Sequence, residues 1–454
     1  MKVTITSSMP TEAQIEHGVV SMTPEMTCAV AARYSRNDEG IDAILEKAAG
    51  LDQNKAVDSI FNMVDYGHAS IADMADLPIF IDGISIWLAY YLWSLSPTAS
   101  GQETSTRYVK FDAENIVSPE DAGIKPEQHE TWRIFIEESA KRYTEMTAYW
   151  ELVLQEYPEL LRIPAHITSD KVIERFKRNF VFDRARYYIP VAAKTNLMMR
   201  MTARDWVTLT RHLGSHYIPE ARSLAAQLKA QLQHVVPRLM KHAEPNEDCV
   251  AGIADELLDD MLAATKVTWV VEPEIGLHIT SSTAVSEIKA TKHAFARHWN
   301  RYAFIGREAS RITATYSING LAMAELRDLN RHRPGTKYCP MVPVGFYGAM
   351  DQVVASPASL SPKSCYEWGA AQTIFHIQHV ASGNSSHPYW GLLGTQYYYE
   401  RTVSLNRLAY EIELRTGTGA HYRYCQHMLD VHEELIKQLP HLAGLLNIGT
   451  GEPE

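Results

Sequence analysis

The sequence predicts an α+β fold that is repeated in two tandem domains, residues 1–240 and 250–454. In both halves a strand-like run is followed by a hydroxyl residue suited to cap a helix, an apolar-periodic helix, a break, and an amphipathic helix that ends at a proline. Corresponding segments lie about 200 residues apart, which indicates a duplicated domain and not a solenoid. The polar stretch 242–249 is expected to link the two halves.

The first copy of this pattern occupies the end of the first half. Alternating residues favour a strand over Lys194–Met201, and Thr202 is suited to the N-cap of a helix expected over Ala203–Leu213. Leucines spaced four apart predict a second helix over Pro219–Val236, and Pro237 ends it.

The second copy repeats the same elements near the C-terminus. Tyr397–Val403 reads as an apolar and aromatic strand, and Ser404 is suited to the N-cap of a helix over Leu405–Arg415. A further amphipathic helix is expected over His421–Leu439, and Pro440 ends it as a proline ended the earlier one.

Each half also contains a strand followed by a buried helix. In the first half the strand is expected at Leu77–Ile81 and the helix at Ile84–Leu95, whose side chains are almost all apolar. In the second half the corresponding strand is Thr313–Asn319 and the helix Leu321–Asn330. Residues 127–157 predict a long amphipathic helix or a pair of helices with a packed aromatic face.

Composition limits the class of protein. Of the 454 residues 46% are hydrophobic and 21% charged, as in ordinary globular proteins. The net charge of −11 argues against a general nucleic-acid binder. The first residues lack the apolar core of a signal peptide, and no apolar run reaches the length of a membrane span. Five scattered cysteines fit reduced thiols, so we expect a cytoplasmic protein without a membrane association.

Two short polar segments follow the buried helices and could bind an anion. After the first helix, Ser105 and Arg107 lie two apart in a loop, and a hydroxyl with a forked guanidinium suits a phosphate. An ordinary surface loop with an exposed arginine is the alternative. After the second helix, Arg331-His332-Arg333 could hold an anionic cofactor or could simply favour the helix dipole.

Other possible sites have less support. His376 and His379 lie three apart and could share one helix face, but no third metal ligand is evident, so no metal site is predicted. Cys339 could act as a nucleophile, although no base for it is identifiable.

Taken in order, the short motifs resemble those of the flavin-dependent thymidylate synthases, the ThyX family. The resemblance rests on seven fragments, four in the first half and three in the second: Ala32-Arg33-Tyr34-Ser35, Gly67-His68-Ala69-Ser70, Glu103-x-Ser105-x-Arg107-Tyr108, Arg186-x-x-Ile189-Pro190, Arg331-His332-Arg333, Thr402-Val403-Ser404-Leu405-Asn406-Arg407-Leu408 and Leu414-Arg415. Each fragment is weak alone, but their order and spacing make the match fairly specific.

The motifs of the family are split between the two halves. The first half keeps the GHxS, ExSxRY and RxxxP elements, and the second keeps RHR, TVS and LxLR. The family's late substrate arginine is kept as Arg415, and the first half has His212 at the matching place. The resemblance implies that each domain is a mostly antiparallel sheet with packed helices. It further implies that the two domains form a pseudo-dimer with hybrid sites, and that two chains form a homodimer mimicking the family tetramer.

The resemblance also implies roles for individual residues. Ser105 and Arg186 would be catalytic, and the pyrimidine nucleotide would be bound by Ser105, Arg107, Arg186 and Arg415. FAD would be bound by His68, Glu103, Arg331, His332, Arg333 and Ser404. The implied reaction is the conversion of dUMP to dTMP, with NADPH and methylenetetrahydrofolate as co-substrates. The alternatives are the same chemistry on another pyrimidine nucleotide such as UMP, or an inactive nucleotide-binding descendant.

Overall fold

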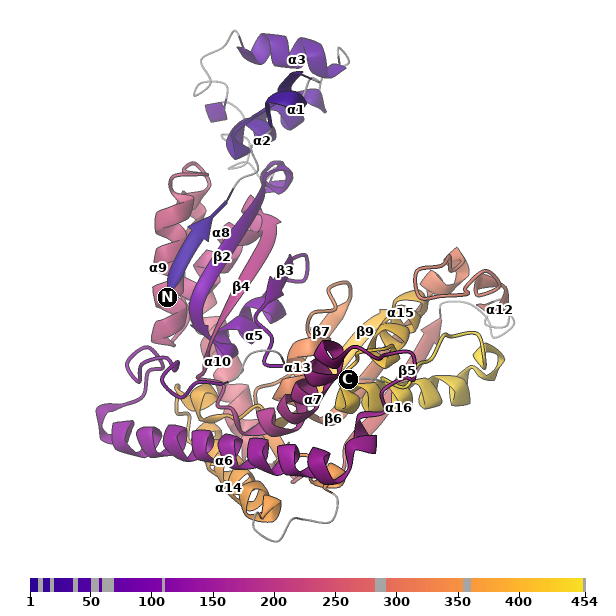
Figure 1. The fold of residues 1–454 in the computed structure, drawn as a ribbon. Coiled ribbons are helices and arrows are strands. Elements are labelled where there is room, and N and C mark those ends of the chain that lie inside the picture. The colour runs from indigo at the N-terminus through magenta and orange to yellow at the C-terminus, as the bar shows by residue number, and fades with distance from the viewer. Residues whose placement is uncertain are drawn as a thin grey trace. The chain divides into compact units, whose positions relative to one another are not determined.

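The computed structural model describes residues 1–6, 11–16, 20–35, 40–49, 57–58, 69–107, 111–281, 291–353 and 361–451. The chain forms two compact units (Figure 1). Unit 1 consists of residues 1–104, 117–125 and 194–256, and unit 2 consists of residues 105–116, 126–193 and 257–454. The two units are thus built from interleaved segments, and the division of the sequence near residues 240–250 stays a prediction.

Unit 1 contains a four-stranded antiparallel sheet in the order β1-β2-β4-β3. The strands are β1 (Lys2–Ile5), β2 (Asp76–Ser85), β3 (Ser100–Glu103) and β4 (Lys194–Thr202). Buried and more exposed residues alternate along β4, which is the pattern of a strand that packs one face on a core. The predicted strands at 77–81 and 194–201 are therefore confirmed, each somewhat longer than expected.

Unit 2 contains a second antiparallel sheet in the order β5-β6-β9-β7, with β8 also paired to β9. Its strands are β5 (Glu274–Ser281), β6 (Ile312–Ala322), β7 (Thr336–Tyr338), β8 (Pro343–Phe346) and β9 (Thr395–Ser404). The α+β class with one mostly antiparallel sheet in each unit is confirmed.

The two sheets share an irregularity that supports the duplication. In β2 the pairing shifts register between Asp82 and Ile84, and Gly83 there has φ +74°. In β6 the pairing shifts between Asn319 and Leu321, and Gly320 has φ +100°. A bulge in this backbone region favours glycine, so the same device lies at the same place in both copies.

Unit 1 also contains several helices. They are α1 (Glu12–Glu16), α2 (Pro24–Tyr34), α3 (Gly40–Ala49), α5 (Ile86–Leu95), α8 (Ala203–Gly214) and α9 (Pro219–Leu232), and α10 (Glu247–Ala264) runs from this unit into the other. Buried Glu220 accepts hydrogen bonds from the backbone N–H and the hydroxyl of Ser85, the N-cap of α5. A carboxylate at a helix N-terminus is favourable, which fixes the start of this helix.

Helices of unit 2 comprise two groups. The long α6 (His129–Glu156), α7 (Asp170–Ala185) and α14 (Pro362–Ala381) pack together in the pairs α6–α7 and α6–α14 (Figure 1). The others are α12 (Thr291–Ala294), α13 (Met323–Leu329), α15 (Leu405–Thr416) and α16 (Tyr422–Gln438). The stretch 127–157 therefore forms one long helix. No helix in the part of the chain that the structure describes is long and apolar enough to cross a membrane.

Two predictions of local structure need correction, and the prediction of the two helix caps is confirmed. The linker expected at 242–249 is shorter, because a 3-10 turn covers Met240–Ala243 and α10 begins at Glu247. Ser404 is the N-cap of α15 but makes no side-chain capping bond, whereas the Thr202 hydroxyl accepts one from the Asp205 N–H. Since both caps are followed by twelve-residue helices, the counterpart of Arg415 is Leu213 and not His212.

Candidate functional site

Four of the predicted arginines surround one carboxylate, Asp328 on α13, within unit 2. Arg186 and Arg331 approach its two oxygens at 3.9 Å. Burial raises the pKa of Asp328, but Arg331, Arg186, Arg415 and Arg107 together outweigh burial and lower the pKa. Residues more than 300 positions apart in the sequence are thus collected around one charge, and their roles in a site stay predictions.

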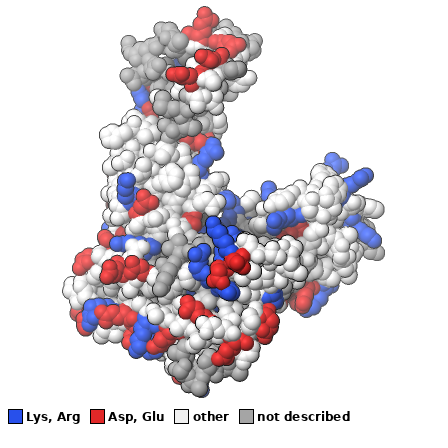
Figure 2. Space-filling model, viewed as in Figure 1, with Lys and Arg blue, Asp and Glu red and all other residues white. Residues whose placement is uncertain are grey.

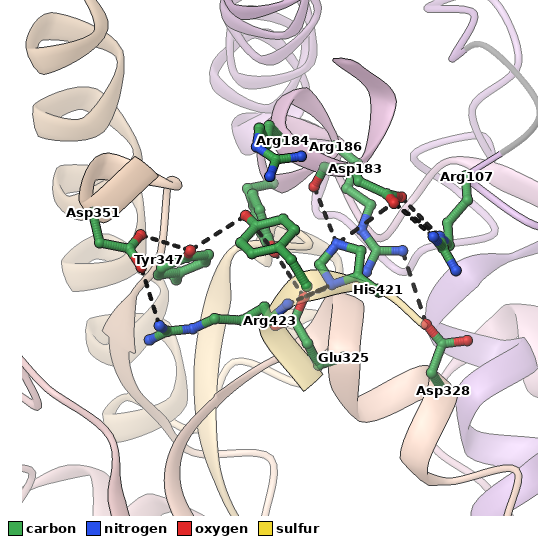
Figure 3. A network of polar contacts seen from close by, with 12 residues as sticks. Arg107, Asp183, Arg184, Arg186, Glu325, Asp328, Tyr347, Asp351, His421 and Arg423 are labelled. Carbon is green, nitrogen blue, oxygen red and sulfur yellow. Dashed lines mark hydrogen bonds and ion pairs between the residues drawn. The ribbon is translucent and has the colours of Figure 1, made fainter. Parts of the chain in front are cut away.

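Arg107 is fixed by a buried ion pair with Asp183 of α7 (Figure 3). Its Nε donates to both Asp183 oxygens at 2.8 and 3.1 Å, Nη2 donates to Oδ2 at 2.7 Å, and Nη1 donates to the carbonyl of Gly419 at 3.1 Å. Burial opposes the charge of Arg107, but Asp183 outweighs it and raises the pKa of Arg107. The backbone N–H of Arg107 donates to the Ser105 hydroxyl, which tightens the loop before Arg107. Arg107 therefore is not the exposed loop arginine of the alternative interpretation.

Arg186 lies at the end of α7 against Glu325 of α13. Its Nη2 donates to Glu325 Oε1 at 3.3 Å, and the Tyr187 hydroxyl donates to the same oxygen at 2.8 Å. Burial raises the pKa of Glu325 to about 7, although Arg186 and Tyr187 act to lower it. Within the described residues, neither Arg186 Nε nor Glu325 Oε2 has a hydrogen-bond partner. Two buried polar atoms without a partner mark a place suited to a ligand or to water.

His332, from the predicted RHR motif, contacts Arg415 of the predicted LxLR motif. Arg415 Nε donates to His332 Nε2 at 2.8 Å, and Arg415 Nη2 donates to the Asp328 carbonyl at 2.6 Å. Burial, followed by Arg415, lowers the pKa of His332 well below its usual value. The imidazole is therefore neutral with Nε2 as acceptor, so its remaining proton lies on Nδ1, which is 3.9 Å from Glu411.

The turn after α13 concentrates positive charge. Burial and then Arg331 lower the pKa of Arg333, and burial lowers the pKa of Lys337 to about 7. Cations that disfavour one another's charge stabilise an added anion. Arg331 and Arg333 consequently fit the pyrophosphate of a flavin dinucleotide. His332 fits less well as a direct ligand, because it is buried and engaged by Arg415.

The charges of this site are local. On the face drawn in Figure 2, acidic and basic residues are interspersed and are not separated by sign. Figure 3 shows the labelled arginines and carboxylates, with Tyr347 and His421, pointing toward one another. The arrangement can bind an anion and can stabilise negative charge that develops on a bound molecule.

The alternative sites remain without support. No group of three or more His, Cys, Asp or Glu side chains that could hold a metal ion occurs in the described part of the chain. His376 Nε2 instead lies 3.4 Å from His387 Nδ1, and burial lowers the pKa of both rings, as it does for His379. These histidines are buried, neutral packing residues.

Comparison with known proteins identifies the first half. Residues 19–238 match the family model described as thymidylate synthase complementing protein. These residues belong to that family. A flavin-dependent thymidylate synthase of Clostridium tetani is 27% identical over 237 residues, which cover 51% of this chain and 86% of that protein. A similar enzyme of Geobacter sulfurreducens is 25% identical over 239 residues, 51% of this chain and 87% of that protein.

Another relative matches nearly the whole length of the chain. A UPF0159 protein of Thermoplasma acidophilum is 20% identical over an alignment that covers 93% of this chain and 95% of that protein, consistent with a duplicated arrangement. Among solved structures, a UMP/dUMP methylase from Streptomyces cacaoi bound with 5-Br dUMP is 17% identical and covers 53% of this chain and 93% of that chain. Its TM-score of 0.31 is too low to carry an argument. The sequence similarity to flavin-dependent thymidylate synthases thus lies in about half of the chain.

Some residues predicted from the thymidylate synthase family are not part of this cluster. Glu103 is the last residue of β3 and belongs to unit 1. Ser404 donates to Asn406 Oδ1 at 2.6 Å, so its hydrogen bond is local. Ser105, in contrast, touches the cluster, because its hydroxyl accepts a hydrogen bond from the Arg107 N–H. His68 lies outside the described residues.

Sequence reasoning missed the carboxylates that hold the arginines. Asp183, Glu325 and Asp328 were assigned no role, although each contacts an arginine predicted from the thymidylate synthase family. Glu325 and Asp328 lie three apart among apolar residues of α13, so they share a face that must be buried. Two acids on the apolar side of a short helix predict buried cationic partners.

Proposed function

We propose that this chain catalyses the flavin-dependent reductive methylation of a uracil nucleotide at C5, with dUMP as the substrate. The arginine cluster around Asp328 supports the proposal most directly, because it joins residues from the split motifs of both halves in one place. Family membership of residues 19–238 supplies the flavin and the class of reaction. The carbon donor is methylenetetrahydrofolate and the reductant is NADPH.

The nucleotide phosphate is bound by Ser105, Arg107 and Arg415. Arg107 is oriented by its fork with Asp183, so little conformational entropy is lost when it meets a phosphate. Arg415 is held in the same way by His332 and by the Asp328 carbonyl. Neutral His332 accepts a hydrogen bond from Arg415, so it orients this guanidinium without cancelling the charge that would bind the phosphate.

Arg186 polarises the uracil. Its guanidinium is buried and keeps its charge, because Asp183, Tyr187, Glu325 and Asp328 oppose the effect of burial and raise its pKa. A buried cation that faces a carbonyl oxygen stabilises negative charge there more strongly than an exposed cation does. Ser105 completes the site as a hydroxyl donor next to the phosphate.

Arg331 and Arg333 hold the flavin through its phosphates. The bound flavin would supply the hydride that reduces the transferred carbon to a methyl group. His68, Glu103 and Ser404 complete the cofactor site in the proposal. In the proposal two chains assemble as a homodimer.

Flavin uptake and turnover test the proposal with a matched pair of variants. The full chain is incubated with FAD, separated from free FAD and denatured, and the released flavin is measured by absorbance. We expect near-stoichiometric flavin, loss of it in Arg331→Ala, and none of that loss in Arg307→Ala, whose side chain is 94% exposed. Methylation of dUMP should exceed that of UMP. Absence of flavin uptake by the wild-type chain would reject the proposal, and faster turnover of UMP would reassign the substrate.

A further inference from the structure

A continuous line of hydroxyl groups joins buried Glu325 to Asp351 at the surface of unit 2 (Figure 3). The Tyr187 hydroxyl donates to Glu325 Oε1 at 2.8 Å, and the Tyr422 hydroxyl donates to Tyr187 at 3.2 Å. Tyr422 and Tyr347 are 3.2 Å apart, and Tyr347 donates to Asp351 Oδ1 at 2.7 Å. Glu325 is fully buried, whereas the Asp351 side chain is 45% exposed.

The number of hydrogens in this line is informative. Glu325, three tyrosines and Asp351 form four oxygen-to-oxygen links, but three hydroxyl groups supply only three hydrogens. When both carboxyls are ionised, one link lacks a hydrogen. One additional proton, on either carboxyl, completes all four links. A line of this kind therefore favours the uptake of one proton, and moving every hydrogen by one link transfers that proton from one end to the other.

The groups around Glu325 are consistent with a proton held there. Arg186, Arg423 and the Tyr187 hydroxyl favour the ionised form, while burial and Asp328 favour the protonated form, and the pKa of Glu325 is raised to about 7. His421 Nδ1 lies 3.9 Å from Glu325 Oε1 and accepts a hydrogen bond from the Arg423 N–H, so it presents a lone pair and not a proton.

The tyrosines themselves stay protonated. Burial raises the pKa of Tyr187, Tyr347 and Tyr422 above the usual value for a phenol. Neutral hydroxyls both donate and accept, so each can pass on a hydrogen without carrying a charge for long. The outer end is accessible, because Asp351 and Tyr422 line a pocket of about 590 Å³ together with Arg184 and Arg423.

We propose that Glu325 and Asp351 exchange one proton through Tyr187, Tyr422 and Tyr347, so that this line connects the arginine cluster to the pocket and to solvent. The protonated carboxyl at one end gives its proton to the neighbouring tyrosine, each tyrosine passes its own hydrogen onward, and the carboxylate at the other end gains one. The transfer leaves all three tyrosines neutral, and one carboxyl is exchanged for the other as the charged group.

This inference rests on the proposed function for its purpose. Methylation at C5 of uracil breaks the C5–H bond, leaves its electron pair with the ring and forms a C–C bond, so one proton must leave the site. Arg186, the proposed uracil ligand, lies 3.3 Å from Glu325. Glu325 is ionised in part near neutral pH, so it can accept the released proton and pass it to Asp351.

Infrared titration of the full chain tests the line without requiring activity. The carbonyl stretch of a protonated buried carboxyl is followed against pH, and Glu325→Gln assigns the band. We expect a wild-type midpoint near pH 7. Tyr422→Phe and Tyr347→Phe each break the line of hydroxyls. When Glu325 is protonated in either variant, the last hydroxyl before the break has no acceptor for its hydrogen, so the protonated form is less stable than in the wild type. The midpoint should therefore fall by about one pH unit, or about 1.4 kcal/mol, in each variant.

Tyr397→Phe is the control, because Tyr397 is a fully buried tyrosine on β9 outside the line, and it should leave the midpoint unchanged. Unchanged midpoints in the folded Tyr422 and Tyr347 variants would overturn the proposal. A shifted midpoint in a chain that methylates no uracil nucleotide would retain the proton line and reject the proposed function. Normal turnover with unshifted midpoints would retain the proposed function and reject the proton line.

Discussion

Removing either partner of the Arg107–Asp183 pair should destabilise unit 2. The Asp183 side chain is fully buried and that of Arg107 is 8% exposed, so neither charge can be solvated by water when its partner is lost. Arg107→Met leaves the Asp183 carboxylate with weaker partners: the charge of Arg186, and His421 Nε2 at 4.0 Å, which belongs to an imidazole that burial keeps neutral. Breaking a buried ion pair from one side costs about 3–5 kcal/mol, whereas an exposed pair is worth less than about 1 kcal/mol.

The assay is urea unfolding of the two single variants and the double variant, followed by tryptophan fluorescence. With a slope of about 3 kcal/mol per M, a loss of about 4 kcal/mol lowers the midpoint by about 1.3 M. Arg107→Met and Asp183→Leu should each show this loss. The double variant should cost much less than the sum of the two, because the apolar pair leaves no buried charge. Single losses below about 1 kcal/mol, or additive effects, would refute the assignment of a buried, coupled pair.

Two further predictions concern stability. Thr202→Ala should cost about 1 kcal/mol in urea unfolding, because the hydroxyl caps α8, and Ser404→Ala should cost less, because its hydroxyl makes no capping bond; equal losses would contradict this difference. The folded state binds the proton of Glu325 more tightly than the unfolded chain does, so the wild type should lose stability as pH rises from about 4.5 to about 7. The loss is about 3 kcal/mol at most, and a Glu325→Gln chain with the same pH slope would exclude it.

The repeated architecture was predictable because it depends on local patterns. Alternation marked the strands, and hydroxyl caps and prolines marked the helix ends, so the order of elements was evident in both halves. The shared register shifts at Gly83 and Gly320 add an observation that comes from the structure. Matching by helix caps then moved the counterpart of Arg415 by one residue, which on a helix is a different face.

Which residues come together in the site was harder to predict from the sequence. Arg107 and Arg186 belong to the first half of the sequence, but their segments fold into unit 2 with α13 and α16. That association depends on contacts between distant residues, which periodicity does not encode. The family resemblance selected the arginines, whereas the acids that hold them belong to none of its motifs; only Glu325 and Asp328 are marked, by their place among apolar residues of one short helix.

The two copies of the last helix position have taken different chemical paths. In unit 2 the position is Arg415, a partly buried cation held by His332. In unit 1 it is Leu213, which is completely buried. An arginine there would place a charge at a fully buried position, which is costly unless a partner is buried with it. A single substitution of Leu213 by arginine would therefore not give the chain two equal sites, because the surroundings of the two positions have also diverged in burial.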